Sequence, residues 1–347
     1  MQNLPMLKSF PITIDFLVYD RFSNHCMANC LEPFRAANTL SANDVYEWNF
    51  VTLDGLSVQS SSELRLMPDQ KFGETKRADF LFIIASYDFR RHDSVASRRA
   101  LRAAMKRYKN IIGLDSGPWM MAGAGIIDNY RATAHWDIID EFSEEFVEVN
   151  VERQKYIFDG NIGTCGGGMA AFDLSLSIIR EINGVTVALD VASIFLSGAD
   201  LPQEYRTNTV CKIQEVQKAL EIMHKNIEDI LTIPNIANKI GISSKQLHRF
   251  FLKDLGQSPK KVYLNIRLSF GRHLLQATQK PINEVALRSG YENVSAFSRA
   301  FKMRFDQTPS EYRPLVAAYK GSKQISFAII ATTLILVAVF LPLIFID

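Results

Sequence analysis

Cysteine is scarce in this chain, which holds only four in 347 residues: Cys26, Cys30, Cys165 and Cys211. No two of them show the C-x-x-C spacing of a zinc or redox site, and Cys26 and Cys30 have no matching His or Cys pair nearby. The spacing excludes the disulfide framework of small secreted proteins, and we expect neither a metal nor a cofactor. A cleavable signal is also missing, because the first apolar run contains Asp15. These absences predict a protein of a reducing cytoplasm.

Excess charge of either sign is absent from the chain as a whole, whose formal net charge is +2. The two halves differ, however. Residues 1–208 hold 20 Lys and Arg against 27 Asp and Glu, a net charge of −7, whereas residues 209–320 hold 18 against 9, a net charge of +9. An acidic module joined to a basic one is typical of proteins in which only the basic module meets nucleic acid.

Charged residues are also missing from residues 324–346, which are apolar almost throughout. As a helix this segment would span roughly 33 Å, about the thickness of the apolar core of a bilayer. Lys320 and Lys323 precede it, and by the positive-inside rule they would keep the upstream domains in the cytoplasm, tethered to the inner membrane. The string ATTLILVAVFLPLIF resembles a transmembrane helix of RND-type efflux transporters. We therefore predict an apolar C-terminal helix with membrane contact over residues 324–346; packing on the protein's own surface is the alternative.

Strand-like and helix-like segments alternate along the first half of the chain. Strands are predicted over residues 12–19, 48–53, 79–84, 111–115, 155–158 and 161–165. Helices are predicted over residues 26–41, 94–109 and 169–182. This alternation predicts an α/β domain over residues 1–196, with a largely parallel sheet covered on both faces. The polar stretch 197–210 then reads as an interdomain linker.

Residues 211–318 show no strand pattern and contain an internal quasi-repeat, in which 233–251 aligns with 282–301. Each copy supplies Ala, Gly four residues later, an apolar anchor and a trailing aromatic: Ala237, Gly241, Leu247 and Phe250, then Ala286, Gly290, Phe297 and Phe301. A small Ala lets two helices approach, Gly permits a tight turn, and the apolar residues anchor the second helix. We predict two helix-turn-helix units, over about 229–252 and 281–303; a helical bundle with a solvated basic face is the alternative.

Capping residues mark where the helices of this half should begin: Thr232, Ser243, Asn293 and Ser310. Ser243 is followed three residues later by Gln246, a spacing that predicts a capping box. Both predicted recognition helices would thus start at a side chain that accepts a backbone hydrogen bond.

The strings IPNIANKIGISSKQLHRFF, INEVALRSGYENVSAFSRAF and FDQTPSEYR resemble the DNA-binding domain of AraC/XylS-type transcription regulators. The resemblance implies seven helices, with a long helix at about 259–276 joining the two units, and a homodimer that meets promoter DNA and RNA polymerase. Each unit would place its second helix in a major groove. The outward positions of these helices are the candidates for DNA contact: Ser244, Lys245, His248, Arg249, Ser295, Ala296, Ser298 and Arg299. Lys260, Lys261 and Arg304 either approach phosphates or lie on a solvated face.

The turn from Leu114 to Gly117 resembles a nucleophile elbow, where a strand ends sharply and a helix begins. With CLEPFRAANTLS and TCGGGMAAFDLSLSII, it resembles the PfpI/class I glutamine-amidotransferase-like domain of GlxA-type AraC regulators. The resemblance implies a flavodoxin-like α/β sandwich. Hydrolases of this fold carry Cys at the elbow, where this chain has Asp115, so we predict that the domain is not an enzyme. A PfpI-class hydrolase or amidase fused to a DNA-binding module is the alternative.

The place of the nucleophile should persist as a concavity at the carboxyl ends of the strands, where we expect a small-molecule effector. The candidate lining residues are Glu32, Asp115, Ser116, Trp119, His135 and Trp136. The alternatives are core packing for the two Trp side chains and helix capping for the two carboxylates. The resemblance is closest to regulators of quaternary-amine catabolism, which implies an effector-responsive activator of a catabolic operon. Carboxylates with aromatic faces suit a trimethylammonium group, although Ala85 and Ser86 replace the Gly-Gly turn of these relatives.

Overall fold

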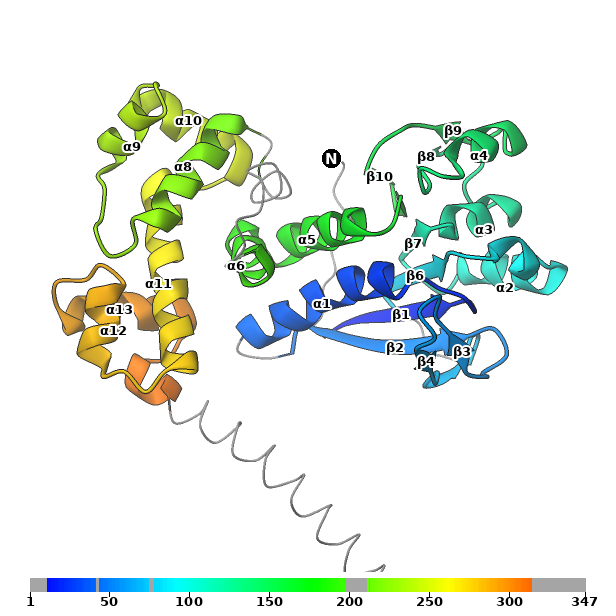
Figure 1. The fold of residues 1–347 in the computed structure, drawn as a ribbon, viewed down its shortest axis with the longest axis horizontal. Coiled ribbons are helices and arrows are strands. Elements are labelled where there is room, and N and C mark those ends of the chain that lie inside the picture. The colour runs from blue at the N-terminus through cyan, green and yellow to red at the C-terminus, as the bar shows by residue number, and fades with distance from the viewer. Residues whose placement is uncertain (1–10, 42–43, 75–77, 197–210, 212, 314–347) are drawn as a thin grey trace, which may run out of the picture. The chain divides into compact units, whose positions relative to one another are not determined.

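The computed structural model describes residues 11–41, 44–74, 78–196, 211 and 213–313. The chain forms two compact units that divide after Lys212 (Figure 1). The predicted linker over 197–210 and the predicted apolar helix over 324–346 lie outside the described residues. Among the helices that are described, none combines the length and apolarity needed to cross a bilayer.

The N-terminal unit is built on a seven-stranded sheet in the order β10-β11-β7-β6-β1-β2-β5. All neighbouring strands run parallel except β10, which is antiparallel to β11. The strands are β1 (Ile12–Val18), β2 (Tyr46–Thr52), β5 (Gln70–Lys71), β6 (Phe80–Ala85), β7 (Asn110–Asp115), β10 (Tyr156–Asp159) and β11 (Ile162–Cys165). The predicted α/β class with a largely parallel sheet is confirmed.

Helices cover both faces of this sheet, since every residue of the central strands β6 and β7 is buried. One group of helices, packed on one another, comprises α1 (Asn24–Leu40), α5 (Met169–Asn183) and α6 (Val185–Leu196). A second group comprises α2 (Val95–Ala104), α3 (Gly117–Gly123) and α4 (Ile139–Glu145), with α2 against α3. Figure 1 shows α2, α3 and α4 lying together on one side of this unit, away from α6.

Short pieces that the sequence pattern did not predict complete this unit. They are the two-residue strands β3 (Val58–Gln59), β4 (Arg65–Leu66), β8 (Arg131–Ala132) and β9 (Asn150–Val151), and the 3-10 helix η1 (Phe89–His92). The helix predicted over 94–109 ends at Ala104. The chain leaves the helix there because Tyr108 is buried, stacks on Phe72 and donates a 2.7 Å hydrogen bond to Asp15 Oδ2.

The C-terminal unit is all-helical within residues 213–313. Its helices are α8 (Gln214–Lys225), α9 (Ile233–Lys239), α10 (Ser244–Leu255), α11 (Pro259–Ala277), α12 (Ile282–Arg288) and α13 (Val294–Phe305), and residues 309–313 are helical as well. Helices α9 and α10 form one helix-turn-helix unit, α12 and α13 form the other, and the long α11 joins them (Figure 1). The predicted double helix-turn-helix fold is confirmed.

The quasi-repeat identifies three of its four anchoring residues correctly. Leu247, Phe297 and Phe301 have no exposed surface, as predicted. The prediction that Phe250 is the trailing aromatic of the first copy is wrong, because the fully buried ring is that of Phe251, four residues after Leu247. Phe250 is half-buried instead, and its ring lies 5.5 Å from the guanidinium of Arg249. A period of 3.6 residues explains the difference, because positions four apart share one face of a helix.

The caps of the C-terminal unit follow the sequence signals with one exception. Ser243 and Gln246 form the predicted capping box, with backbone-to-side-chain bonds of 3.0 and 3.2 Å in the two directions. Thr232 and Asn293 also cap their helices. The prediction for Ser310 is wrong: Thr308 caps the last helical segment, and its own backbone N–H donates to Glu311 at 2.8 Å.

Candidate effector site and DNA-reading surface

The turn between β7 and α3 has the backbone of an elbow. Asp115 adopts a left-handed conformation with a φ of 63°, which is uncommon for a residue other than glycine. Its neighbours hold this conformation: Ser116 N donates to Ala85 O at 2.9 Å, and His135 N donates to Asp115 O at 3.0 Å. The strand therefore stops at once and α3 starts two residues later, as the resemblance implies.

Three glycines leave the room that this turn needs. A Cβ on Gly117 would lie 2.3 Å from Ile83 O, and one on Gly113 would lie 2.6 Å from Met121 Sδ. On Gly167, which follows β11, it would lie 2.9 Å from Asp115 Cβ. Real side chains do not approach so closely, so the backbones of β6, β7, α3 and the Gly-rich loop meet only because these positions lack a side chain.

The carboxyl group of Asp115 is buried at this turn, with 7% of the residue exposed. Ser86 Oγ donates a 3.0 Å hydrogen bond to Asp115 Oδ2 from the end of the neighbouring strand. Burial raises the pKa of Asp115, while the nearby His135 and the hydrogen bonds from Ser86 and Ser116 act in the opposite direction. A carboxyl in this setting holds a proton more readily than an exposed carboxyl does.

Four of the six predicted effector residues gather here. Ser116 is buried beside Asp115, and His135 is half-buried, with Nδ1 accepting a 3.3 Å hydrogen bond from Asp137 N. Trp136 is 76% exposed, and its ring lies 5.4 Å from the His135 ring. Core packing, the alternative for Trp136, does not describe a side chain with that exposure.

The other two predicted residues lie elsewhere. Trp119 is buried in an aromatic cluster and packs on Phe89 at 5.3 Å and on Phe146 at 5.0 Å, as its core-packing alternative requires. Glu32 lies in the middle of α1 and pairs with Arg35 at 2.6 Å, whereas the helix is capped by Ser23. The end of α1 near the elbow is at Cys26, so Glu32 lies about 9 Å further along the helix.

Sequence reasoning missed His25 and Cys26, and it noted Ser86 only as a departure from the relatives. The electrostatic field of Asp115 reaches Cys26, and a Cβ on Gly168 would lie 3.7 Å from His25 Cε1. The available signal was topological: Ser86 directly follows β6, and His25 and Cys26 lie in the first turn of α1, the helix that follows β1.

Three of the thiols of the N-terminal unit, those of Cys26, Cys30 and Cys165, are buried near this edge and form no disulfide. Burial raises the pKa of all three, that of Cys30 to about 12. Cys165 Sγ accepts a 3.4 Å hydrogen bond from Gly167 N. Within the part of the chain that the structure describes, no group of His, Cys, Asp and Glu is arranged to hold a metal ion.

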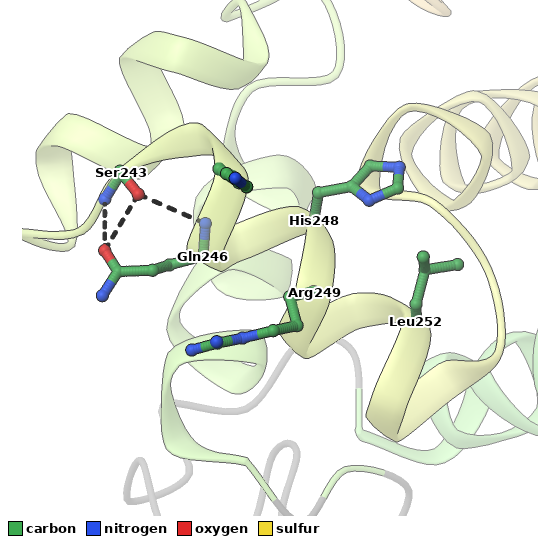
Figure 2. A pocket seen from close by; sticks show the side chains of 6 residues that line it. Ser243, Gln246, His248, Arg249 and Leu252 are labelled. Atoms are coloured by element: carbon green, nitrogen blue, oxygen red, sulfur yellow. Dashed lines mark hydrogen bonds between the residues drawn. The ribbon is translucent and has the colours of Figure 1, made fainter.

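The first recognition helix, α10, presents its predicted DNA-contacting residues to solvent. Ser244, Lys245, His248 and Arg249 are all exposed, while Leu247 between them is buried. Lys245, His248 and Arg249 border a shallow concavity together with Ser243, Gln246 and Leu252. Figure 2 shows the capping bonds of Ser243 and Gln246 at the start of the helix. The side chains of His248, Arg249 and Leu252 project from the turns that follow.

The second recognition helix, α13, is similar but less open. Ser295 and Arg299 are exposed, whereas Ala296 and Ser298 are half-buried. Lys260 and Lys261 are exposed in the first turn of α11. Arg304 is engaged within the unit, since it donates to Asn265 O and lies over the Phe305 ring, and is therefore a weaker candidate for a phosphate contact.

The chain joins a basic unit that has two exposed recognition helices to an α/β unit that has an elbow. This combination is that of a class of DNA-binding regulators, and comparisons with known proteins agree with this classification. The DJ-1/PfpI family matches residues 27–181, and a helix-turn-helix domain matches residues 236–314. HTH-type transcriptional regulator CdhR of Pseudomonas aeruginosa is 31% identical over 307 residues, 87% of this chain and 91% of the relative. HTH-type transcriptional regulator GlxA of Rhizobium meliloti is 31% identical over 313 residues, 86% of this chain and 95% of the relative.

Two further proteins are similar to this chain. HTH-type transcriptional regulator GbdR of Pseudomonas aeruginosa is 27% identical over 319 residues, covering 90% of this chain and 86% of the relative. A solved AraC family transcriptional regulator from Pseudomonas putida is 22% identical, covers 53% of this chain and 100% of its own, and has a TM-score of 0.48. This chain belongs to the family of HTH-type transcriptional regulators that join a DJ-1/PfpI domain to an AraC-type helix-turn-helix domain. It is a DNA-binding transcriptional regulator.

The buried thiols should be chemically silent in the folded protein. A raised pKa means that the reactive thiolate forms only at pH values above the usual range for cysteine, and burial blocks access as well. We expect Cys26, Cys30 and Cys165 not to react with Ellman's reagent at pH 8, and to react fully once guanidinium unfolds the chain. Rapid native labelling of any of the three, located by peptide mass spectrometry, would contradict this.

Proposed function

We propose that the chain is an effector-responsive activator of a catabolic operon in the bacterial cytoplasm. A small metabolite binds at the carboxyl edge of the sheet around Asp115 and Ser116, next to His135 and Trp136. Binding changes how a homodimer engages promoter DNA and RNA polymerase through α10 and α13. The observation that carries this proposal is the elbow itself, which presents a buried, hydrogen-bonded carboxyl beside an exposed aromatic ring.

The chemistry at the elbow favours binding over catalysis. A thiol hydrolase needs a thiolate at this turn, but Asp115 occupies the position and the nearby Cys26 is buried with a raised pKa. The base within reach of Ser116 is the carboxyl of Asp115, which also accepts from Ser86, while Nδ1 of His135 already accepts from Asp137 N. The rival function, a PfpI-class hydrolase or amidase, thus lacks an activated nucleophile among these residues.

The effector class that suits this edge is an amino acid or a quaternary amine. The faces of aromatic rings attract a trimethylammonium group, and a carboxylate adds an attraction between opposite charges. Trp136 offers an exposed ring, and Asp115 offers the carboxyl. Ser86 shapes the site differently from a Gly-Gly turn, because its hydroxyl already holds one oxygen of Asp115.

The recognition helices can be tested by removing one guanidinium from each. Arg249→Ala and Arg299→Ala should each weaken binding to the specific site by about 1–3 kcal/mol and relax base preference locally. Lys260→Ala should instead lower the salt dependence of binding without changing sequence preference. The measurement is fluorescence anisotropy on duplexes selected from a random pool with the full chain. Affinities and base preferences identical to wild type for both Arg variants would show that the recognition faces are assigned wrongly.

The effector site can be tested with a variant that removes only the charge. Asp115→Asn keeps the size of the side chain and should abolish the rise in melting temperature that glycine betaine or carnitine gives the wild type. Binding of the selected DNA without effector should remain unchanged. Asp128→Asn, an exposed residue of the same unit, is the matched control. Amidase or hydrolase turnover that disappears in Asp115→Asn would instead place the protein among the enzymes.

We also propose that residues 324–346 contact the inner membrane, on the basis of their length and lack of charge. Cells expressing the full chain and a chain ending at Lys320 would be fractionated side by side. The full chain should sediment with membranes and resist extraction by salt, whereas the shortened chain should stay in the supernatant. Equal recovery of both in the supernatant would contradict membrane contact.

A further inference from the structure

The two helix-turn-helix units meet in a junction over the middle of α11. The loop 226–231, which precedes α9, is called the leading loop below, and residues 289–291, between α12 and α13, are called the second turn. Both segments are held by residues of α11 that lie one helical turn apart, Tyr263 and Arg267. The contacts of each are specific hydrogen bonds, which distinguishes this junction from a general apolar packing.

Tyr263 holds the leading loop. The residue is buried, and its hydroxyl donates to the carbonyl oxygen of Asn226 and accepts a 3.4 Å hydrogen bond from Leu231 N. The two ends of the loop are therefore tied to a single atom. Because the loop leads directly into α9, this atom also positions the first helix-turn-helix unit on α11.

Arg267 holds the second turn. Its Nε donates to Ser289 O at 2.9 Å, its Nη2 donates to Gly290 O at 2.6 Å, and the guanidinium lies 4.4 Å from the centre of the Tyr291 ring. Such a two-pronged contact fixes direction as well as distance, because the guanidinium is planar and rigid. This contact positions the second helix-turn-helix unit on α11.

The leading loop and the second turn also touch each other. A Cβ on Gly290, whose φ is 73°, would lie 2.5 Å from Ile227 O and 2.8 Å from Ile230 Cγ1. Glu228 and Arg288 face each other at the same place, with 3.9 Å between their charged groups. The two units are thus in direct contact beside α11 and do not behave as independent bodies at the ends of a helical rod.

We infer that this junction fixes the spacing and phase of α10 and α13, so that Tyr263 and Arg267 determine which separation of two DNA half-sites the protein accepts. The inference rests on the proposed recognition faces. Consecutive major-groove segments are about 10–10.5 base pairs apart, so one inserted base pair rotates a half-site by about 35°. A protein whose two recognition helices are rigidly spaced loses affinity for a site with the wrong separation. A protein whose junction is loosened adjusts the spacing and loses less affinity.

The test compares spacing tolerance rather than affinity alone. Duplexes selected from a random pool with the full chain would be remade with one and two base pairs inserted between the half-sites. The variant is Tyr263→Phe with Arg267→Met, which removes the hydrogen bonds and keeps most of the apolar volume. We expect one inserted base pair to weaken wild-type binding by about tenfold or more, and variant binding by less than about threefold. If the double variant fails to fold, the same spacing series is measured with Tyr263→Phe alone.

Arg272→Met is the matched control, because Arg272 is a buried arginine of the same helix whose guanidinium lies over the Phe305 ring within the second unit. It should lower stability while keeping the wild-type spacing penalty. A junction variant that is folded, binds more weakly and keeps the wild-type penalty would overturn the inference alone. Selected DNA with a single half-site would overturn the inference together with the proposed recognition faces.

Discussion

The left-handed backbone of Asp115 is the constraint around which the N-terminal unit is arranged. A side-chain-bearing residue in this conformation costs roughly 1–3 kcal/mol and persists only where its surroundings enforce it. Here the enforcement comes from β6, through the hydrogen bond between Ser116 N and Ala85 O, and from the bond between His135 N and Asp115 O. Gly113 and Gly117 allow β7 and α3 to come close enough for both bonds to form. The same turn brings Ser86 and Asp115 together, so the geometry of the fold and of the candidate effector site have one cause.

The C-terminal unit depends on a different kind of constraint, in which short local signals are repeated. A cap starts each recognition helix, a glycine ends the turn before it, and one fully buried side chain anchors it, Leu247 in α10 and Phe297 in α13. Signals of this kind lie within about twenty residues of chain, so they can be predicted from sequence. The two helix-turn-helix units and the capping box at Ser243 were predictable for this reason, whereas the long α11 was implied by the resemblance to AraC/XylS-type regulators.

The features that sequence reasoning missed are those that depend on contacts between distant segments. The helix after Ser94 ends early because Tyr108 bonds to Asp15, 93 residues away along the chain. Ser86 reaches Asp115 across 29 residues, and neither residue carries a local sign of the other. Trp119 and Glu32 were included among the effector residues on residue type alone, which does not reveal that one ring packs in the core and the other side chain pairs with Arg35. The error of choosing Phe250 instead of Phe251 is different, because it involves no distant contact and helical periodicity alone distinguishes the two residues.

The exchange of a thiol for a carboxyl at the elbow has a consequence for oxidative stress. Peroxides attack thiolates and convert them through sulfenic acid to higher oxides, and an elbow cysteine of low pKa is a ready target for that reaction. Asp115 cannot follow that route, and Cys26, Cys30 and Cys165 are buried close behind it as neutral thiols. The elbow of this chain therefore offers peroxides no thiolate to attack.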